Sequence, residues 1–343
     1  FFMHWCIIVS VIELQDPVRT ATKGVPAGTP LLYMEVFMAQ VFLTYEQQIE
    51  KLIYEKNLMV QNREYAVEEL KEIGYFVLIG GYKGLFKNPT TKNFKDGTRF
   101  EDVLALYKFD ENLRELFLKY LLKVERHLRS LISYYFCEKY GENQSFYLDE
   151  RNFSIYPKYK SDVQRLIGEL DKLANKNSDY AYLNHHRNLY QNVPLWVLFH
   201  GTTFGTLSKF YMLMTQDLQF KVSKEFYGLS EKQLGQSLKV LTKFRNVCAH
   251  NERLFSYKTR NDIPNLQAHK FLKLPKKGHN YAVGTHDLFA VVIILKYMLS
   301  AADFCKLKNR IVRVIDTYLD QTHALSKKDI MYAMGFPENW LML

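Results

Sequence analysis

The sequence has 343 residues, 48% of them hydrophobic, and its 46 Lys and Arg exceed its 36 Asp and Glu to give a net charge of +10. This composition supplies the buried core of one large or two ordinary domains, so the chain is globular. The four Cys are isolated and have no His at metal-ligand spacing beside them. This spacing excludes a disulfide framework and a zinc site, and it favours a reducing cytoplasm. The positive charge favours a polyanionic partner, either nucleic acid or an anionic membrane surface.

The first part of the chain differs from the rest in composition. Residues 1–14 are apolar like a signal peptide, but no basic segment precedes them and no cleavage site follows at once, so we do not expect secretion. Residues 16–30 have the Gly, Pro and Thr content of a linker. We therefore expect residues 1–43 to be an N-terminal extension outside the working fold, with Met34 or Met38 as a candidate natural start.

Helical periodicity begins at Thr44, which forms a capping box with Gln47 and opens a predicted helix over residues 44–60. A second helix over residues 63–76 ends near Gly74. Residues 80–100 concentrate Gly, Pro, Asn, Lys and Thr, which is typical of a long basic loop. The sequence therefore predicts a small N-terminal helical lobe with a basic loop, residues 44–99, before the main domain, residues 100–343.

The main domain is also predicted to be helical throughout. A long helix over residues 100–140 has apolar residues at steps of three and four, and Gly141 ends it. No run alternates with period two, and the apolar run at 288–299 is interrupted by Lys296 and too short to span a bilayer, so it predicts a buried helix. The sequence thus predicts an all-α protein. The further expected segments are helices at 161–174, 193–214 with a break between Gly201 and Gly205, 229–255 and 285–319, with a basic loop at 258–280.

One stretch, FRNVCAHNERLF at residues 244–255, places several polar side chains where the pattern predicts an apolar, core-facing helix. Buried polar groups need partners, so we expect a specific role for this motif. On an ideal helix Asn246 and His250 are neighbours at i and i+4, and Arg245 lies about 100° round from Asn246. The motif therefore directs one guanidinium, one amide and one imidazole to a common region.

This set of groups suits the cleavage of RNA by attack of its own 2′-OH. Histidine transfers protons near neutral pH, and the planar donors of arginine pair with phosphate oxygens. One His250 per chain does not serve easily as both acid and base, which indicates that two copies of the helix share a composite site in a homodimer. The reaction needs no metal and no other cofactor.

The motif resembles known sequences. Arg245-Asn246-x-x-x-His250 matches the R-x(4–6)-H motif of HEPN ribonucleases, and the string RNVCAHNERLF is similar to the signature of the abortive-infection Abi-like proteins (AbiD/AbiF type). Segments at 46–76, 100–136 and 194–211 add to the resemblance, which covers roughly residues 44–310 in order. His200 is a departure, because the family pattern favours an acidic residue there.

The resemblance implies a HEPN-type helical fold, dimerisation through the motif helices and metal-independent RNA cleavage by a toxin-like effector of phage defence. It also implies association with a structured non-coding RNA. In that case Arg245 binds the scissile phosphate, His250 transfers the proton and Asn246 orients one of them. Asn251 and Glu252 would hold the dimer or the His tautomer. The alternative for the motif is a polar helix junction satisfied by interhelical hydrogen bonds.

Other charged residues are candidates for supporting or RNA-binding roles. Glu125 and Arg129 resemble the charged segment of the family on the long helix, with surface ion pairing as the alternative. Basic residues share one face of that helix or lie in the two basic loops with Phe86, Phe94 and Phe271, a composition that suits phosphates and unpaired bases, although such residues also form ordinary solvated faces and connectors. These RNA-binding candidates are Lys119, Lys123, Arg126, Lys83, Lys87, Lys92, Lys95, Lys273, Lys276 and Lys277.

Two functions follow from these observations. The first is a dimeric, cytoplasmic HEPN endoribonuclease with no metal, no other cofactor and no membrane association, acting in abortive infection. The second is a catalytically inactive HEPN RNA-binding protein or ribonucleoprotein scaffold with the same basic surface. Replacement of His250 by Ala discriminates between them, because only the enzyme loses its activity.

Overall fold

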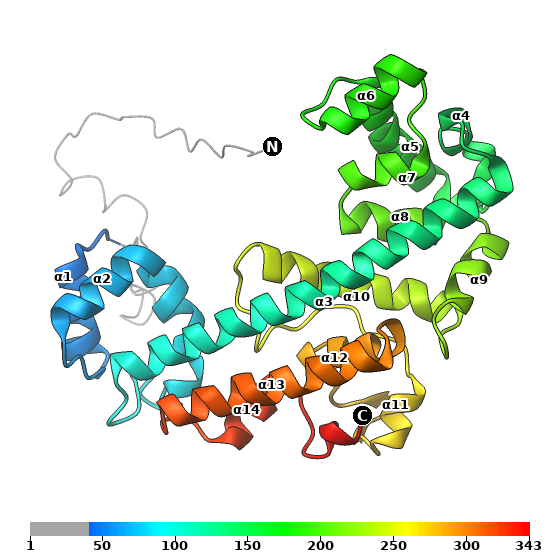
Figure 1. The fold of residues 1–343 in the computed structure, drawn as a ribbon. Coiled ribbons are helices and arrows are strands. Elements are labelled where there is room, and N and C mark those ends of the chain that lie inside the picture. Colours follow the sequence, from blue (N-terminus) through cyan, green and yellow to red (C-terminus); the bar gives the residue numbers. More distant parts are fainter. Residues whose placement is uncertain (1–40) are drawn as a thin grey trace, which may run out of the picture.

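The computed structural model describes residues 41–343 and shows an all-α helical bundle built around one long helix, α3 (Phe100–Tyr140), as predicted (Figure 1). Buried side chains recur every three or four residues along its 41 residues, so an apolar stripe follows the whole helix. Gly141, with φ +99°, ends it. The helices α10 (Glu231–Ala249) and α13 (Ala301–Gln321) both pack against α3, which is therefore the axis of the bundle.

The N-terminal lobe lies beside the first turns of α3, at the left of Figure 1. Thr44 and Gln47 form the predicted capping box, and Gly74, with φ +87°, ends the second helix as expected. The first helix changes to a π-helical turn and ends at Glu55, with Lys56 as the C-cap, short of the predicted residue 60. Of the predicted extension, residues 1–43, all but the last three lie outside the described residues. The elements of the lobe are α1 (Tyr45–Glu50), η2 (Lys51–Glu55), α2 (Arg63–Ile73), η3 (Phe76–Gly80) and η4 (Lys83–Phe86).

A group of short helices surrounds the other end of α3, at the upper right of Figure 1. The predicted break between Gly201 and Gly205 is present, because the chain leaves helical geometry at Thr202 and Thr203 caps the next helix through the N–H of Thr206. The elements of this group are α4 (Gln144–Tyr147), η5 (Glu150–Asn152), η6 (Pro157–Tyr159), α5 (Lys160–Asn175), α6 (Ala181–Tyr190), α7 (Leu195–Leu198), η7 (Phe199–Gly201), α8 (Phe204–Leu213) and α9 (Gln216–Lys224).

Two predictions for the C-terminal part were wrong. The segment 258–280 is not one loop, because it contains a short helix and a two-stranded antiparallel hairpin. The single helix predicted over 285–319 is two helices, since Ser300 adopts an extended backbone and caps the second one through the N–H of Asp303. Helical periodicity continues across this break and hides it. The elements after α10 are α11 (Gln267–Phe271), β1 (Lys276–Lys277), β2 (Asn280–Tyr281), α12 (Leu288–Met298), α13, α14 (Lys327–Met334) and η8 (Trp340–Met342).

The helix α12 is the centre of the C-terminal core. Every side chain from Leu288 to Leu295 is fully buried. A helix that is apolar on all sides must be enclosed, here by α10, α13 and their neighbours. This confirms the prediction of a buried helix at 288–299. Within residues 41–343, no helix combines the length and the apolar character needed to cross a bilayer.

Candidate active site

The motif lies at the C-terminal end of α10. Ser230 and Gln233 form the predicted capping box at its start, but the helix ends at Ala249, earlier than the predicted residue 255. His250 is the C-cap residue and still donates its backbone N–H to the carbonyl of Asn246, at 2.9 Å. Asn251 then adopts a left-handed backbone with φ +56°, and the N–H of Glu252 donates to the carbonyl of Val247, at 3.0 Å. Asn251 therefore suits this helix end, because Asn tolerates the left-handed region better than most residues.

The expectation that the motif is buried was wrong for most of its polar side chains. Asn246, His250 and Asn251 are exposed, whereas Phe244 and Val247 on the other face of α10 are buried. No hydrogen bond joins the side chain of Asn246 or His250 to another residue between 41 and 343. The helix is apolar on one face only, and Asn246 and His250 project away from that face. A satisfied polar helix junction therefore does not describe Asn246 and His250.

Arg245 is different, because a buried carboxylate holds it. Its Nε donates to Oε2 of Glu125 on α3, at 3.2 Å, and a terminal amino group of Arg129 donates to the other carboxylate oxygen, at 3.0 Å. The exposed side-chain fractions are 25% for Arg245, 17% for Arg129 and only 6% for Glu125. Glu125 is thus not part of a surface ion pair. It joins two guanidinium groups, and the trio has a net charge of +1.

The donors that Arg245 does not use are free for a ligand. Its bond to Glu125 is made through Nε alone, and its terminal amino groups donate no hydrogen bond to any residue in the described part of the chain. A guanidinium fixed through one edge presents its remaining donors in a defined direction. The arrangement therefore suits a phosphate approaching from the exposed side of α10.

The imidazole of His200 lies near the trio of Arg245, Glu125 and Arg129. Loss of solvent around the ring of His200, in η7, and next the positive charge of Arg129 lower the pKa of this imidazole below its usual value. The ring of Tyr182, on α6, lies 6.3 Å from the ring of His200 and meets it edge-on. The sequence marked His200 only as a departure from the family pattern, and no periodicity links η7 to the middle of α3.

A buried carboxylate fixes the chain where it leaves the motif. Asp110, on α3, accepts backbone N–H bonds from Leu254, at 2.8 Å, and from Phe255, at 2.6 Å. It also accepts the hydroxyl of Tyr82, at 2.8 Å, and a guanidinium N–H of Arg114, at 2.9 Å. Burial raises the pKa of Asp110, and these four donors oppose that shift. This cluster was not predicted from the sequence, because Asp110 lies within the helical pattern like any exposed acidic residue.

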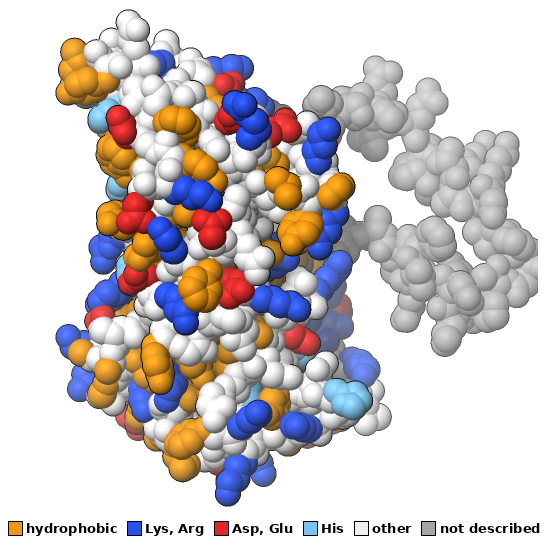
Figure 2. All heavy atoms as spheres, turned by 90° about the vertical axis from the view of Figure 1, so that its right-hand side faces the viewer, with side chains coloured by type: hydrophobic (Ala, Val, Ile, Leu, Met, Phe, Trp, Pro, Cys, Tyr) orange, Lys and Arg blue, Asp and Glu red, His pale blue; other side chains and the backbone are white. Residues whose placement is uncertain are grey.

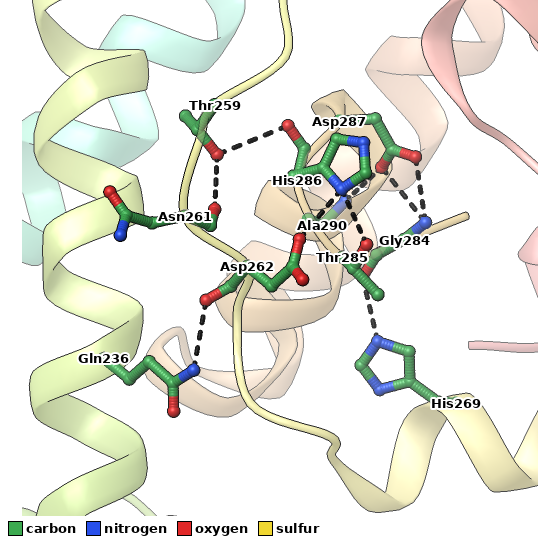
Figure 3. Close-up of polar contacts among 10 residues, drawn as sticks. All are labelled: Gln236, Thr259, Asn261, Asp262, His269, Gly284, Thr285, His286, Asp287 and Ala290. Carbon is green, nitrogen blue, oxygen red and sulfur yellow. Dashed lines mark hydrogen bonds and ion pairs between the residues drawn. The ribbon is translucent and has the colours of Figure 1, made fainter. Parts of the chain in front are cut away.

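Polar contacts also tie the segment after the motif to α10 and α12 (Figure 3). Gln236 on α10 donates to the backbone carbonyl of Asp262, at 3.2 Å, and the Asp262 carboxylate lies 2.9 Å from Nδ1 of His286. Thr285 contacts the same ring nitrogen, at 2.9 Å. Because acid and hydroxyl meet one nitrogen instead of opposite ones, they do not form a proton relay. We interpret this network as a structural brace.

The basic candidates on α3 lie on a different side from Glu125. Lys119, Lys123 and Arg126 are exposed, and Lys123 forms an ion pair with Asp303 on α13, whereas Glu125 faces Arg245 on α10. On the helix these three residues lie about 100° to 160° round from Glu125, which explains the separation. Elsewhere on the surface, as on the face in Figure 2, basic, acidic and hydrophobic side chains are mixed. Net charge alone therefore does not locate a binding surface.

The basic loops fit the RNA-stacking hypothesis less well. Phe86 and Phe94 are only 1% and 3% exposed, so the expectation that they stack on bases was wrong, while Phe271 is 55% exposed. Phe86 and Phe94 instead anchor their loop in the core. Lys92 and Lys95 donate to carbonyls within their own loop, those of Pro89 and Leu85.

The remaining loop lysines differ in exposure. Lys83 and Lys87 are half-buried, and burial lowers the pKa of Lys83. Lys273, Lys276 and Lys277 are exposed around the β1–β2 hairpin. Their roles in RNA binding stay predictions.

Between residues 41 and 343, no three His, Cys, Asp or Glu side chains are grouped so that they could hold a metal ion. Comparison with curated proteins and with solved structures finds no match. A family model described as Abi-like protein matches residues 68–256, from α2 to the segment just after the motif, which is more than half of the chain. The chain therefore belongs to the Abi-like protein family.

Proposed function

We propose that this protein is a metal-independent endoribonuclease of the HEPN type that acts as a toxin-like effector in abortive infection. Membership of the Abi-like family indicates a function related to abortive infection. The observation that carries the proposed activity is the arrangement at the end of α10. There the buried Glu125 orients Arg245 on the helix that also exposes Asn246 and His250.

In the proposed reaction Arg245 binds the scissile phosphate. Its free terminal amino groups donate to the non-bridging oxygens, where negative charge increases as the 2′-oxygen attacks phosphorus. Arg129 holds the other oxygen of Glu125, so that carboxylate stays in place and Arg245 keeps its orientation. Arg245 contributes electrostatic stabilisation and no proton transfer, because a guanidinium does not lose its proton near neutral pH.

His250 transfers the proton in this scheme. As a neutral imidazole it takes the proton of the 2′-OH, and a second imidazole, which is protonated, donates its proton to the leaving 5′-oxygen. The products are a 2′,3′-cyclic phosphate and a free 5′-OH. The second imidazole comes from His250 of another copy of the chain, so the proposed enzyme is a homodimer with a composite site. Asn246, one turn before His250, orients the phosphate or the ring.

The proposed setting is the cytoplasm, where the enzyme cuts cellular RNA during phage infection and a structured non-coding RNA binds or regulates it. The net charge of +10 supports a polyanionic partner without naming it. In this proposal, contacts outside the motif select the RNA that is cut.

A second function is favoured by one feature of His250. Its side chain has no hydrogen bond to any residue of the described part of the chain, so nothing in a single copy fixes its tautomer or orientation. A catalytic histidine is normally oriented by a partner. In an endoribonuclease the second copy would supply that partner, whereas a catalytically inactive HEPN RNA-binding protein or scaffold needs none.

The test incubates the purified chain with labelled total RNA in EDTA and examines the fragments and their end groups. The matched variants are His250→Ala and His323→Ala, because His323 is an exposed histidine in the α13–α14 connection, away from the motif. We expect cleavage with 2′,3′-cyclic phosphate ends from the parent and from His323→Ala. We expect at least about a hundredfold loss in His250→Ala, the usual effect of removing a general base.

Two results would contradict the proposal. Fragments that form equally with His250→Ala would come from another site or a contaminant. Tight RNA binding without cleavage by any variant, after removal of copurified RNA, would favour the scaffold.

A further inference from the structure

A groove runs between α3 and α13, on a different side of α3 from Arg245. One hollow of about 810 Å³ is lined from both helices, and a smaller one of about 370 Å³ continues it and shares Lys119, Tyr120 and Lys306 with it. The smaller hollow shares Lys123, Arg126 and Asp303 with a third hollow of about 1390 Å³. The shared residues show that the three hollows adjoin one another, and we call the three together the α3–α13 groove.

The first two hollows are strongly basic. Seven basic side chains line them against two acidic ones, Glu111 and Asp303. Only two of the seven form ion pairs within the described part of the chain, Lys108 with Glu69 and Lys123 with Asp303. The basic residues are Lys108, Lys119, Lys123, Arg126, Lys306, Arg310 and Arg313.

The contribution of α13 was missed from the sequence. Lys306, Arg310 and Arg313 follow one another at steps of four and three, so they share one exposed face of the helix. That face meets the exposed face of α3 that carries Lys119. Two basic rows on adjacent helices, with a channel between them, concentrate positive potential more than either row alone.

The third hollow adds an aromatic side chain. Tyr227, in the connection between α9 and α10, is 95% exposed and lines this hollow together with Lys123 and Arg126. Its neighbour Phe226 is buried and lies edge-on to the ring of His127, at 5.3 Å between ring centres, so the connection is anchored beneath the exposed ring. An anchored, exposed aromatic ring beside cations is a platform for an unpaired base.

We propose that the α3–α13 groove binds a single-stranded stretch of RNA, with phosphates along Lys119, Lys306, Arg310 and Arg313 and an unpaired base on Tyr227. The basic path suits a phosphodiester backbone, and the aromatic ring favours a single strand because duplex bases are already stacked. The choice of RNA as the ligand rests on the proposed function, and the rest of the proposal rests on the groove alone. Binding here is separate from the chemistry at Arg245 and His250, because the two lie on different sides of α3.

The test measures binding of a fluorescent single-stranded pyrimidine 20-mer RNA by the full chain, in EDTA, over a series of salt concentrations. The groove variant combines Lys306→Ala, Arg310→Ala and Arg313→Ala. The matched control removes three exposed positive charges on or next to α5, away from the groove, by Lys160→Ala, Lys172→Ala and Lys176→Ala. Both variants lose the same net charge at exposed positions, so folding is similarly affected.

We expect the groove variant to bind at least tenfold more weakly at low salt. The slope of log affinity against log salt should fall by about 2, because each lost phosphate contact on a single strand removes about 0.7. The control should stay within twofold of the parent. Equal weakening of both triple variants would mean that only overall charge matters, and binding like the parent by the groove variant would overturn the proposal.

Tyr227→Ala tests the single-strand assignment. We expect roughly fivefold or greater weakening for the single strand with an unchanged salt slope, since stacking on one base contributes about 1–3 kcal/mol. A hairpin duplex RNA of equal charge should bind more weakly than the single strand, and Tyr227→Ala should not change its affinity. Tighter binding of the duplex would contradict the proposal. These assays do not depend on cleavage, so they succeed or fail independently of the proposed endoribonuclease activity.

Discussion

The two sides of α3 carry positive charge in different ways. Towards α10, Arg245 and Arg129 are mostly buried and share the carboxylate of Glu125, which fixes their direction. Towards α13, basic side chains are exposed and most have no ion-pair partner in the described part of the chain. Fixed donors suit one phosphate in one position, as catalysis requires. Mobile surface charges suit a backbone that passes through many positions.

The largest expected difference between the two sides is in stability. Glu125→Ala leaves two partly buried guanidinium groups together without a counter-charge, so we expect the free energy of unfolding to fall by about 2–3 kcal/mol. Lys123→Ala removes a side chain whose ion pair with Asp303 is partly exposed to solvent, and we expect a loss below about 1 kcal/mol. Denaturant unfolding of both variants measures the difference.

Glu125→Gln is the control for this comparison. It keeps the shape of the side chain and one carbonyl acceptor, so its loss should lie between those of the two Ala variants. Equal losses for Glu125→Ala and Lys123→Ala would show that the two sides do not differ in the way described.

A smaller, pH-dependent effect on stability is expected from His269. His269 is fully buried, with Nε2 donating to the carbonyl of Gly284, at 2.8 Å, and Nδ1 accepting the N–H of Leu266, at 3.1 Å. Burial lowers the pKa of His269 below its ordinary value of 6.5. The unfolded chain therefore binds this proton first as the pH falls. Stability contributed by the neutral ring is full above about pH 6.5 and is lost below it, by at most about 1.4 kcal/mol per pH unit.

We expect unfolding measurements between pH 7.5 and 5.5 to show this slope in the parent and in His250→Ala. His269→Gln should start less stable, with a flatter dependence on pH over the same range. An unchanged slope in His269→Gln would assign the pH dependence to other groups.

The sequence predicted the fold class and most helices because their determinants are local. The stripe along α3, the capping boxes at Thr44 and Ser230 and the apolar run of α12 each lie within one segment. The break at Ser300 was missed because apolar periodicity continues through it, although Ser300 followed by Asp303 is a helix-start signal.

The candidate site was predicted less completely. Arg245, Glu125 and Arg129 were named from the sequence, and the structure brings them together. The exposure of Asn246 and His250 was not predicted, because a periodic pattern does not show where a helix ends or which face another helix covers. Asp110 and the α13 side of the groove depend on contacts between distant segments, which one sequence without pairing information does not contain.

The separation of chemistry from RNA binding is tested by measuring cleavage rate and affinity on the same RNA for two variants, His250→Ala and the triple variant of α13. We expect His250→Ala to keep the affinity within twofold and to lose cleavage at least about a hundredfold. We expect the reverse for the α13 variant, with weaker binding but a cleavage rate within threefold of the parent at saturating RNA. Loss of cleavage at saturation by the α13 variant, or cleavage by His250→Ala at the parent rate, would contradict the separation of chemistry from RNA binding on the two sides of α3.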